Sequence, residues 1–349
     1  MSSFEKLEFL GSGALNLDII YEIEDMALVR RSGFDLHPGR EISGSHREAE
    51  KLVDFLESHG TLRTRSGGGS SANTICCLSL LGHRTGFAGV TGEDQAGGFV
   101  LEDMAEVDCS MVKKRGKTAV CIVVMEKTGQ DRAMFVAPHS MEMCFADPEV
   151  VERVGDTEVL HLSSLVHTRG LNSQGKLVDA LRPDQFLSFD PGELYAARGL
   201  RALSGILKRT DVLFITEQET EMLFPGLSWE QGLKELYPLI NRNRTEDRGC
   251  RCLLNEIFRE AGGPLIICKR GRRGVSAFTP ALSFSCPAER VSRIVDNTGA
   301  GDAFNAGFLH AASSGRPIAE CMKAGVRTAA MSLSGFGREW MEGLTEKRF

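Results

Sequence analysis

The chain has 349 residues, of which 42% are hydrophobic and 25% are charged, and its formal net charge is -6. This length and composition are typical of a globular protein with one large α/β domain and an appendage, and they exclude a long disordered tail. Because the charge balance is acidic, we expect no basic surface for nucleic acid or for an anionic membrane.

The ten cysteines are scattered and form neither a C-x-x-C pair nor a cysteine/histidine cluster with zinc spacing. The sequence therefore predicts no disulfide framework and no structural metal. The N-terminus lacks a basic region followed by an apolar one, and no apolar run is long enough to cross a membrane. We expect a cytoplasmic protein that is a monomer or a homodimer.

The N-terminal segment predicts a strand, a glycine turn and a second strand over residues 9–21. Gly11 and Gly13 could begin a dinucleotide-binding fingerprint, but Asn16 stands where that motif needs a glycine, and extended structure follows instead of a helix. On an extended segment Asn16 and Asp18 share one face, so both could reach a single polyol. Turn formation is the alternative, because both residue types favour loops.

A helix is expected over residues 46–58, and three consecutive glycines, Gly67 to Gly69, then precede a strongly apolar helix. Glycines let the backbone approach a ligand closely, and Asn73 in the first turn of the helix offers a donor and an acceptor to a hydroxyl. A flexible linker is the alternative, although a linker would seldom lead at once into so apolar a helix.

Residues 118–125 and 131–137 are rich in β-forming side chains and predict two strands joined by a hairpin. Arg132 could approach a substrate or a phosphate from the second strand. The alternative is a cation on a solvent-facing strand, and this alternative is the simpler explanation.

Short apolar strands at 159–163 and 186–190 are separated by a helix, an alternation typical of a parallel, doubly wound sheet. Asp190 ends the second strand, at the edge where such sheets bind ligands. Between the two strands, residues 170–176 match a Walker A loop as far as its lysine. Leu177 follows where that loop needs a hydroxyl for Mg²⁺, so we expect an ordinary helix start and not a P-loop NTPase.

Three acids, Glu217, Glu219 and Glu221, follow a predicted buried strand at 211–215. Clustered acids at the end of a strand can hold hydrated Mg²⁺. Acids are also common at the start of a helix, where they pair with its dipole, so both explanations stay open.

A basic turn with two glycines, Gly271 and Gly274, follows a predicted strand at 264–268. The glycines permit a tight turn, and Lys269 or Arg270 could contact nucleotide phosphates. An ordinary basic hairpin turn is the alternative.

The most informative stretch runs from Val295 to Leu309, where small residues and glycines lead into an acid and then into apolar residues at helical spacing. It predicts a tight loop that begins a helix. Because Gly299, Ala300 and Gly301 have little or no side chain, their N–H groups can approach a ligand, and the start of a helix stabilises negative charge. The stretch therefore predicts an anion-binding loop.

Asp302 lies in the first turn of this helix. A carboxylate in that position ordinarily pairs with the helix dipole. Beside amides that hold a transferring phosphoryl group, it could instead accept the proton of an attacking hydroxyl. The spacing alone leaves both roles open.

Residues 296–307 resemble the C-terminal signature of the ribokinase-like (PfkB) carbohydrate and nucleoside kinases, D-T-x-G-A-G-D-x-F-x-x-G, and match it nearly completely over twelve positions. The resemblance extends over residues 10–337 and is carried by five separated motifs in the expected order. It implies that Asp302 is the catalytic base and that the amides from Gly299 to Asp302 hold the phosphoryl group.

The resemblance also implies roles for residues elsewhere in the chain. Taken with the arguments above, it implies substrate contacts at Asn16, Asp18, Gly68, Gly69 and Asn73, nucleotide contacts at Lys269, Gly271, Gly274, Thr298 and Asn305, and a Mg²⁺-side carboxylate at Glu221. Gln218 replaces the asparagine of the family pattern N-x-x-E, and its extra methylene shifts the amide relative to a phosphate. The family often binds a monovalent cation such as K⁺ at the loop that holds Asp296 and Thr298.

The implied fold is α/β, with a doubly wound, mostly parallel central sheet flanked by helices. A small β-sheet lid is expected within about residues 17–66 and 112–137 of one kinase domain over 1–349; such lids exclude water from the reaction. We expect ATP- and Mg²⁺-dependent phosphotransfer to a sugar or a nucleoside. The long N-terminal region, with residues 33–39, is similar to the adenosine-kinase-type branch and favours a nucleoside or ribose-like acceptor. A non-catalytic sugar or nucleoside sensor on the same fold is the alternative, although the base and the anion-binding loop are both intact.

Overall fold

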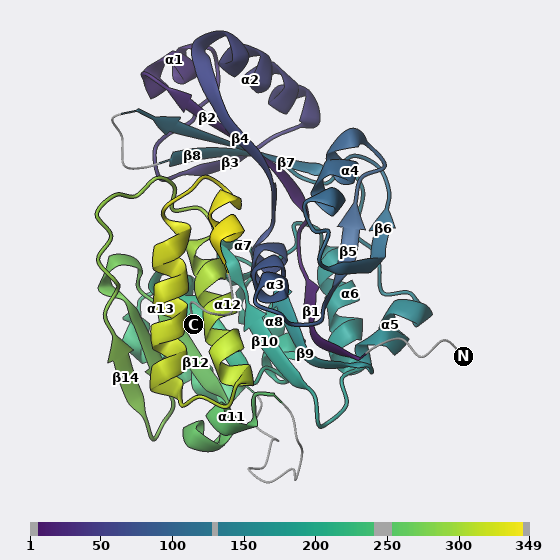
Figure 1. Ribbon diagram of the computed structural model, residues 1–349, viewed down its shortest axis with the longest axis vertical. Helices are drawn as coiled ribbons and strands as arrows, with labels where there is room; N and C mark the ends of the chain where they lie inside the picture. The colour runs from purple at the N-terminus through teal and green to yellow at the C-terminus, as the bar shows by residue number, and fades with distance from the viewer. Residues whose placement is uncertain (1–5, 128–131, 241–252, 345–349) are drawn as a thin grey trace.

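The computed structural model describes residues 6–127, 132–240 and 253–344, which form a large sheet covered by helices and a smaller sheet above it (Figure 1). The large sheet has nine strands in the order β14-β13-β12-β11-β10-β9-β1-β5-β6. The neighbouring strands from β12 to β6 pair in parallel, and β13 runs antiparallel to both of its neighbours, β12 and β14. The strands are β1 (Leu7–Ser12), β5 (Thr85–Thr91), β6 (Asp108–Lys114), β9 (Thr157–Ser163), β10 (Phe186–Asp190), β11 (Val212–Thr216), β12 (Leu265–Lys269), β13 (Val275–Phe278) and β14 (Ser283–Cys286).

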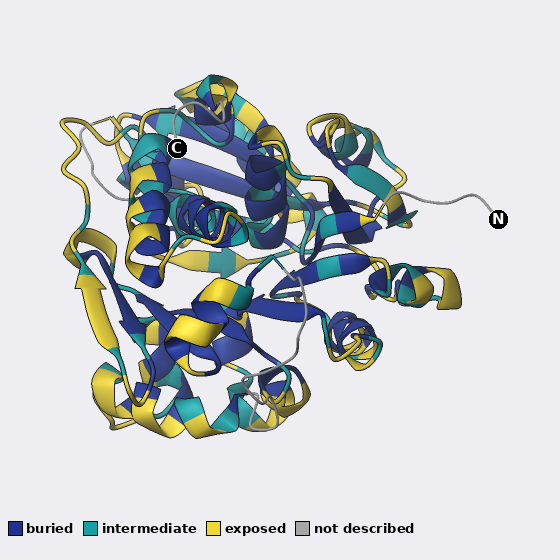
Figure 2. Cartoon of the chain, turned by 60° about the horizontal axis from the view of Figure 1, so that its bottom comes forward, coloured by how far each residue is buried: buried dark blue, intermediate teal, exposed yellow. Residues whose placement is uncertain are grey.

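Helices cover both faces of this sheet because its central strands are apolar on both sides. In β11, Phe214 packs into one hydrophobic core and its neighbour Leu213 into the other. The core that holds Phe214 includes residues of α3 (Ser70–Leu80), α4 (Gln95–Glu102), α11 (Asn255–Ala261), α12 (Ala300–Ser313) and α13 (Ile318–Ser332). The opposite core includes residues of α5 (Pro148–Val154), α6 (Thr168–Asp179), α7 (Gly192–Ala196), α8 (Gly199–Leu207), α9 (Glu217–Leu223) and α10 (Trp229–Leu236). Figure 2 shows the resulting pattern, in which buried strands are enclosed by helices exposed only on their outer faces. The predicted doubly wound sheet is confirmed.

The smaller sheet has five strands in the order β3-β8-β7-β2-β4. They are β2 (Asn16–Ile23), β3 (Glu41–Ser43), β4 (Gly60–Gly68), β7 (Ala119–Glu126) and β8 (Arg132–Ala137). Helices α1 (Met26–Arg31) and α2 (His46–His59) pack on one face through residues such as Met26 and Leu52. The other face carries Asp18, opposite Cys121 in the register of β2 and β7, and lies toward the large sheet. These strands include the segments that the sequence analysis expected in a lid, and the role of the sheet as a lid stays a prediction.

Several local predictions from the sequence are confirmed. Ser45 caps α2 with a capping box, which explains why the helix begins at His46 as expected. Residues 170–176 lie inside α6 and form no phosphate-binding loop. The predicted hairpin turn at 126–130 falls mostly outside the described residues, as does the charged stretch 241–248. In the described part of the chain, no helix has the length and apolar character needed to span a membrane.

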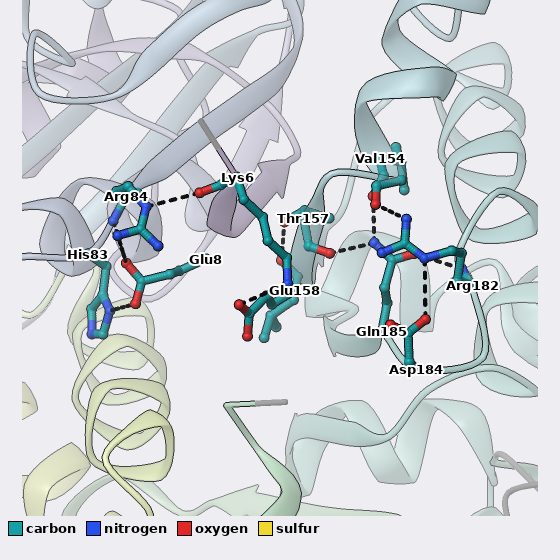
Figure 3. A network of polar contacts seen from close by, with 12 residues as sticks. Lys6, Glu8, His83, Arg84, Val154, Thr157, Glu158, Arg182, Asp184 and Gln185 are labelled. Atoms are coloured by element: carbon teal, nitrogen blue, oxygen red, sulfur yellow. Dashed lines mark hydrogen bonds and ion pairs between the residues drawn. The ribbon is translucent and has the colours of Figure 1, made fainter. Parts of the chain in front are cut away.

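Polar side chains tie together the amino ends of the parallel strands (Figure 3). Arg84 donates to the backbone of Lys6 at 2.9 Å, and Lys6 forms an ion pair with Glu158 at 3.1 Å. The carboxyl ends lie at the opposite edge of the sheet, where β10 ends at Asp190 and β12 at Lys269. Hydrogen bonds and ion pairs within the protein thus connect the amino ends of the strands. The carboxyl ends carry polar groups at the edge where such sheets bind ligands.

Candidate active site

Asp302 lies in the first turn of α12 and receives hydrogen bonds from the first turn of α3. The Ser70 hydroxyl donates to Asp302 Oδ1 at 2.6 Å, and Asn73 Nδ2 donates to Asp302 Oδ2 at 2.9 Å. The pKa of Asp302 is raised to about 6, chiefly by desolvation and to a smaller extent by Asp190, while the two hydrogen bonds and Lys269 oppose the rise. The side chain remains partly exposed, so a ligand can reach it. A carboxylate with these properties suits a general base at neutral pH.

The loop before Asp302 presents backbone donors. Gly299 caps α12 in the left-handed conformation (φ 75°), which glycine adopts without strain. Within the described part of the chain, no hydrogen-bond acceptor reaches the N–H groups of Gly301 and Asp302, and Ala300 has only a long contact of 3.5 Å to the Asn297 carbonyl. These donors at the start of a long helix are available to an anion.

A cavity of about 980 Å³ opens beside this loop. Its lining includes Gly301, Ala300 and Lys269, and also apolar residues of α12 and α13 such as Phe304 and Val326. Its charged lining is mostly cationic and consists of Arg132, Lys269, Arg272, Arg273, Arg290 and Arg293 with only Glu289 and Asp296 as acids. An apolar wall and a cationic end in one cavity match a purine ring and a polyphosphate chain.

Lys269 is the buried cation closest to the loop. Its Nζ forms an ion pair with Asp190 and would lie 3.3 Å from a Cβ atom added at Gly301. Burial alone would lower the pKa of Lys269, but Asp190 and Glu219 hold it above its ordinary value. The lysine is therefore fully charged next to the anion-binding loop.

Glu219, and not Glu221, is the acid that the structure brings to this cluster. Thr216 caps α9 with a capping box, so the Glu219 side chain turns back toward the end of β11 and is buried. Desolvation and the nearby Asp190 carboxylate raise the pKa of Glu219. Glu221 and Gln218 are exposed on the same helix. The sequence analysis favoured Glu221 because the start of the helix, which decides the side on which each acid lies, could not be fixed from the sequence.

The smaller sheet carries two of the predicted substrate contacts, Asp18 and Asn16. Asp18 is only 8% exposed, and its Oδ1 atom has no hydrogen-bond partner within the described residues. Burial raises the pKa of Asp18 to about 7, with Arg338 opposing the rise and Asp296 and Asp302 adding to it. Asn16 precedes it on β2, directly opposite Gly68 of β4. The buried carboxylate therefore needs a donor, which a substrate hydroxyl could supply.

Two predicted nucleotide contacts, Thr298 and Asn305, are engaged elsewhere and do not line the cavity. The Thr298 hydroxyl and N–H donate to Asp296 Oδ1 at 2.7 and 2.8 Å. Asn305 lies on the buried face of α12 and donates to Asp190 Oδ2 at 2.6 Å. Lys269, Gly271 and Gly274 do line the cavity.

Comparison with known proteins agrees with this geometry. The model of the pfkB family carbohydrate kinases matches residues 52–339. The chain belongs to this family. An uncharacterized sugar kinase from Archaeoglobus fulgidus is 32% identical over 274 residues, which cover 76% of this chain and 97% of that protein. A cytidine kinase from Thermococcus kodakarensis is 25% identical over 290 residues, which cover 82% of this chain and 95% of that kinase.

Solved kinases share the fold along the whole chain. Adenosine kinase from Schistosoma mansoni, in complex with 2-fluoroadenosine, has a TM-score of 0.76 at 16% identity. The match covers 99% of this chain and 100% of the adenosine kinase chain. Ribokinase from Arabidopsis thaliana, complexed with ribose and ATP, has a TM-score of 0.69 at 18% identity. The match covers 98% of this chain and 97% of the ribokinase chain. Both branches of the ribokinase-like family thus have this architecture.

The sequence did not reveal every polar residue of this pfkB-family site. Ser70 lies inside a motif that was noticed for its glycines and for Asn73, and a serine directly after the glycine that caps a helix gives no special signal. Asp190 was noted only for its place at a strand end. Arg338 contacts both Asn73 and Asp103, and it is too far from them in sequence for any pattern to connect the three.

Gly68 offers a test of the acceptor side. A Cβ atom at this position would overlap the Asp18 carboxylate, so Gly68→Ala should displace Asp18 from its place on β2. We expect the KM for the acceptor to rise about tenfold, the usual scale for a disturbed hydrogen bond to a charged group, while the KM for ATP stays unchanged. Gly98→Ala is the control, because a Cβ atom there meets nothing within 4 Å. Equal kinetics in the two variants would contradict a substrate role for Asp18.

Proposed function

We propose that this pfkB-family protein transfers the γ-phosphoryl group of ATP to a hydroxyl of a sugar or nucleoside, with Asp302 as the general base. The observation that carries the proposal is the position of Asp302 directly after Ala300 and Gly301, which line the cationic cavity, in a loop where the N–H groups of Gly301 and Asp302 have no acceptor within the described residues. Hydrogen bonds from Ser70 and Asn73 hold its carboxylate against the first turn of α3, and the residue remains partly exposed. The base, the phosphate loop and the acceptor pocket would then meet at one point.

Each residue has a role in an in-line transfer. Asp302 takes the proton of the acceptor hydroxyl as that oxygen attacks, and the N–H groups of Gly299, Ala300 and Gly301 stabilise the negative charge on the phosphoryl oxygens. The Lys269 ammonium group lies next to Gly301 and would stabilise the negative charge on the same phosphoryl oxygens. Arg132 lines the cavity from β8 of the lid and contacts Asn297, so it can add a cation when the lid covers the acceptor. The lid also excludes water, which would compete as acceptor.

Mg²⁺ fits the site as an ion carried mainly by the nucleotide. No group of three or more His, Cys, Asp or Glu side chains in the described chain could hold a metal ion. Mg²⁺ usually keeps several waters and binds through phosphates and one or two carboxylates, and there it neutralises charge on the phosphates. Glu219, buried beside Lys269, is the carboxylate that we assign to its hydration shell. K⁺ at the Asp296 loop remains an implication of the family.

The carboxylate assignment can be tested with a matched pair on α9. We expect Glu219→Gln to raise the Mg²⁺ concentration for half-maximal activity about tenfold, the scale reported for residues that support metal ligands indirectly. Glu221→Gln makes the same chemical change on the exposed side of the helix and should leave the Mg²⁺ requirement unchanged. A shift in the Glu221 variant alone would reverse the assignment.

The acceptor class is the open choice within this function. The long N-terminal region, α1 and α2 of the lid, and the cytidine kinase among the relatives favour a nucleoside or a ribose-like sugar. The direct experiment measures ADP release from ATP and Mg²⁺ with a panel of sugars and nucleosides, after a thermal-shift screen of the same compounds with and without an ATP analogue. Ligand-induced stabilisation without ADP release for any of them would favour the sensor alternative.

A further inference from the structure

A continuous chain of polar contacts joins the C-terminal segment to Asp302. Arg338 lies between α13 and the 3-10 helix Glu339–Gly343 and is only 8% exposed. Its Nε atom donates to Asn73 Oδ1 at 3.0 Å, and Asn73 Nδ2 donates to Asp302 Oδ2 at 2.9 Å. Its Nη1 atom donates to Asp103 Oδ2 at 2.8 Å. Four side chains from separate parts of the chain are thus connected in a row.

The chemistry of the end groups fixes the orientation of the amide between them. A guanidinium only donates hydrogen bonds and a carboxylate only accepts them. Asn73 therefore has to present its oxygen to Arg338 and its NH₂ group to Asp302. Without Arg338, the amide oxygen of Asn73 loses its donor, and the side chain can then move so that its NH₂ group no longer keeps a fixed position against the Asp302 carboxylate.

Arg338 is itself held firmly. Asp103 Oδ2 accepts from Arg338 and also from the Gly67 N–H at 2.8 Å. The Arg338 N–H donates to the Ser66 hydroxyl at 3.2 Å. These contacts attach Arg338 to the end of β4, immediately before the glycines that lead into α3. A side chain held at both ends of its guanidinium can transmit a fixed geometry to Asn73.

We propose that Arg338 is a positioning residue for the general base, acting by locking the Asn73 amide so that its NH₂ group always donates to Asp302. This inference rests on the proposed function, because it assumes that Asp302 accepts the proton. It predicts that Arg338 affects proton transfer without contacting ATP, the acceptor hydroxyl or the phosphoryl group.

The groups around Asp302 determine the direction of the expected pH effect. Ser70 and Asn73 on α3 donate to its carboxylate, and Lys269 on β12 attracts it. Asp190 on β10 and Asp18 on β2 oppose its ionisation. Loss of a correctly oriented Asn73 donor removes one of the contacts that lower the pKa of Asp302. The base would then stay protonated to a higher pH.

The experiment compares pH profiles of kcat/KM for the best acceptor in two matched double variants. Arg338→Met with Asp103→Asn removes the positioning pair and leaves no unpaired buried charge. Arg209→Met with Asp211→Asn makes the same changes in the buried pair that joins Arg209 and Asp211 at 3.1 Å near the amino edge of the sheet. We expect the first variant to lose about tenfold in kcat/KM near pH 6.5 and to move the acid limb to higher pH, with an unchanged KM for ATP. The control should keep the wild-type midpoint, and melting curves verify that both variants are folded.

A second comparison tests whether Arg338 acts through Asn73. In an Asn73→Ala background, Arg338→Met should cause no further shift of the acid limb, because the amide that it orients is already absent. An additional shift of full size in that background, or an unmoved midpoint in the first double variant, would overturn the inference. A wild-type protein that phosphorylates no acceptor would instead defeat the proposed function, so the two failures are separable. Arg338→Lys, which retains a donor and the charge, should recover part of the loss.

Discussion

Asp302→Asn is expected to reduce kcat by about two orders of magnitude or more, the usual contribution of a general base. Asparagine has nearly the same shape, so Ser70 can still donate to its oxygen and the start of α12 should be preserved. The amide cannot accept the proton of the acceptor hydroxyl. An ATP analogue should bind to the variant with nearly unchanged affinity, since the donors that hold the phosphates belong to the backbone and to Lys269.

The measurement combines steady-state kinetics with binding of a non-hydrolysable ATP analogue. Asp302→Glu is the control, because it retains a carboxylate but moves it by one methylene, and it should fall between wild type and Asp302→Asn. In the wild type, kcat/KM should decline as the pH falls below about 6, where Asp302 becomes protonated. A kcat for Asp302→Asn close to that of the wild type would refute the assignment of the base.

The sequence could predict those parts of the fold and site that depend on residues close together in the chain. Alternating short apolar strands and helices predicted the parallel sheet, and the small residues before Asp302 predicted a loop whose amides are free. Gly68 and Gly69 predicted a close approach of a ligand to the backbone, which stays a prediction, and the structure places the Asp18 carboxylate where a Gly68 side chain would be. In each case one short segment contains all the physical reasons for its own conformation.

Other parts depend on contacts that no local pattern encodes. Glu219 and Glu221 are equivalent acids in sequence, and only the capping box at Thr216 determines which of them points toward β11. Asn305 was expected to reach the nucleotide, but the phase of α12 turns it to the sheet and to Asp190. Arg338 is 265 residues away from Asn73, so its place in the site depends entirely on tertiary packing.

Replacing Lys269 with methionine is expected to have the second large effect, this time on stability as well as activity. Lys269 is the cation between the buried side chains of Asp190 and Glu219. Methionine fills a similar volume but leaves these carboxylates without a counter-charge. Removing one partner of a buried ion pair typically costs about 3–5 kcal/mol in the free energy of unfolding. ATP affinity should also fall, because the cavity loses its innermost cation.

The stability loss should depend on pH in a defined direction. The pKa of Glu219 is already raised in the folded protein by desolvation and by Asp190, and Lys269 opposes that rise. Without the lysine its pKa rises further, so the folded variant binds a proton that the unfolded chain releases. Stability of the variant is then regained as the pH falls from 8 toward 5. The ammonium group of wild-type Lys269 stays charged over this whole window and adds no pH dependence of its own.

Urea unfolding of wild type and variant at pH 8 and pH 5.5 measures both effects. Lys113→Met is the control, since Lys113 forms an ion pair with the more exposed Asp147 at 3.1 Å, and removal of such a pair typically costs less than about 1 kcal/mol. The gap between Lys269→Met and wild type should narrow at pH 5.5, whereas the small gap for Lys113→Met should not. The Lys269 variant could be as stable as the Lys113 variant at pH 8 only if the buried carboxylates were neutral in the wild type. That result would contradict the proposed ion pairs of Lys269 and its role beside the phosphate-binding loop.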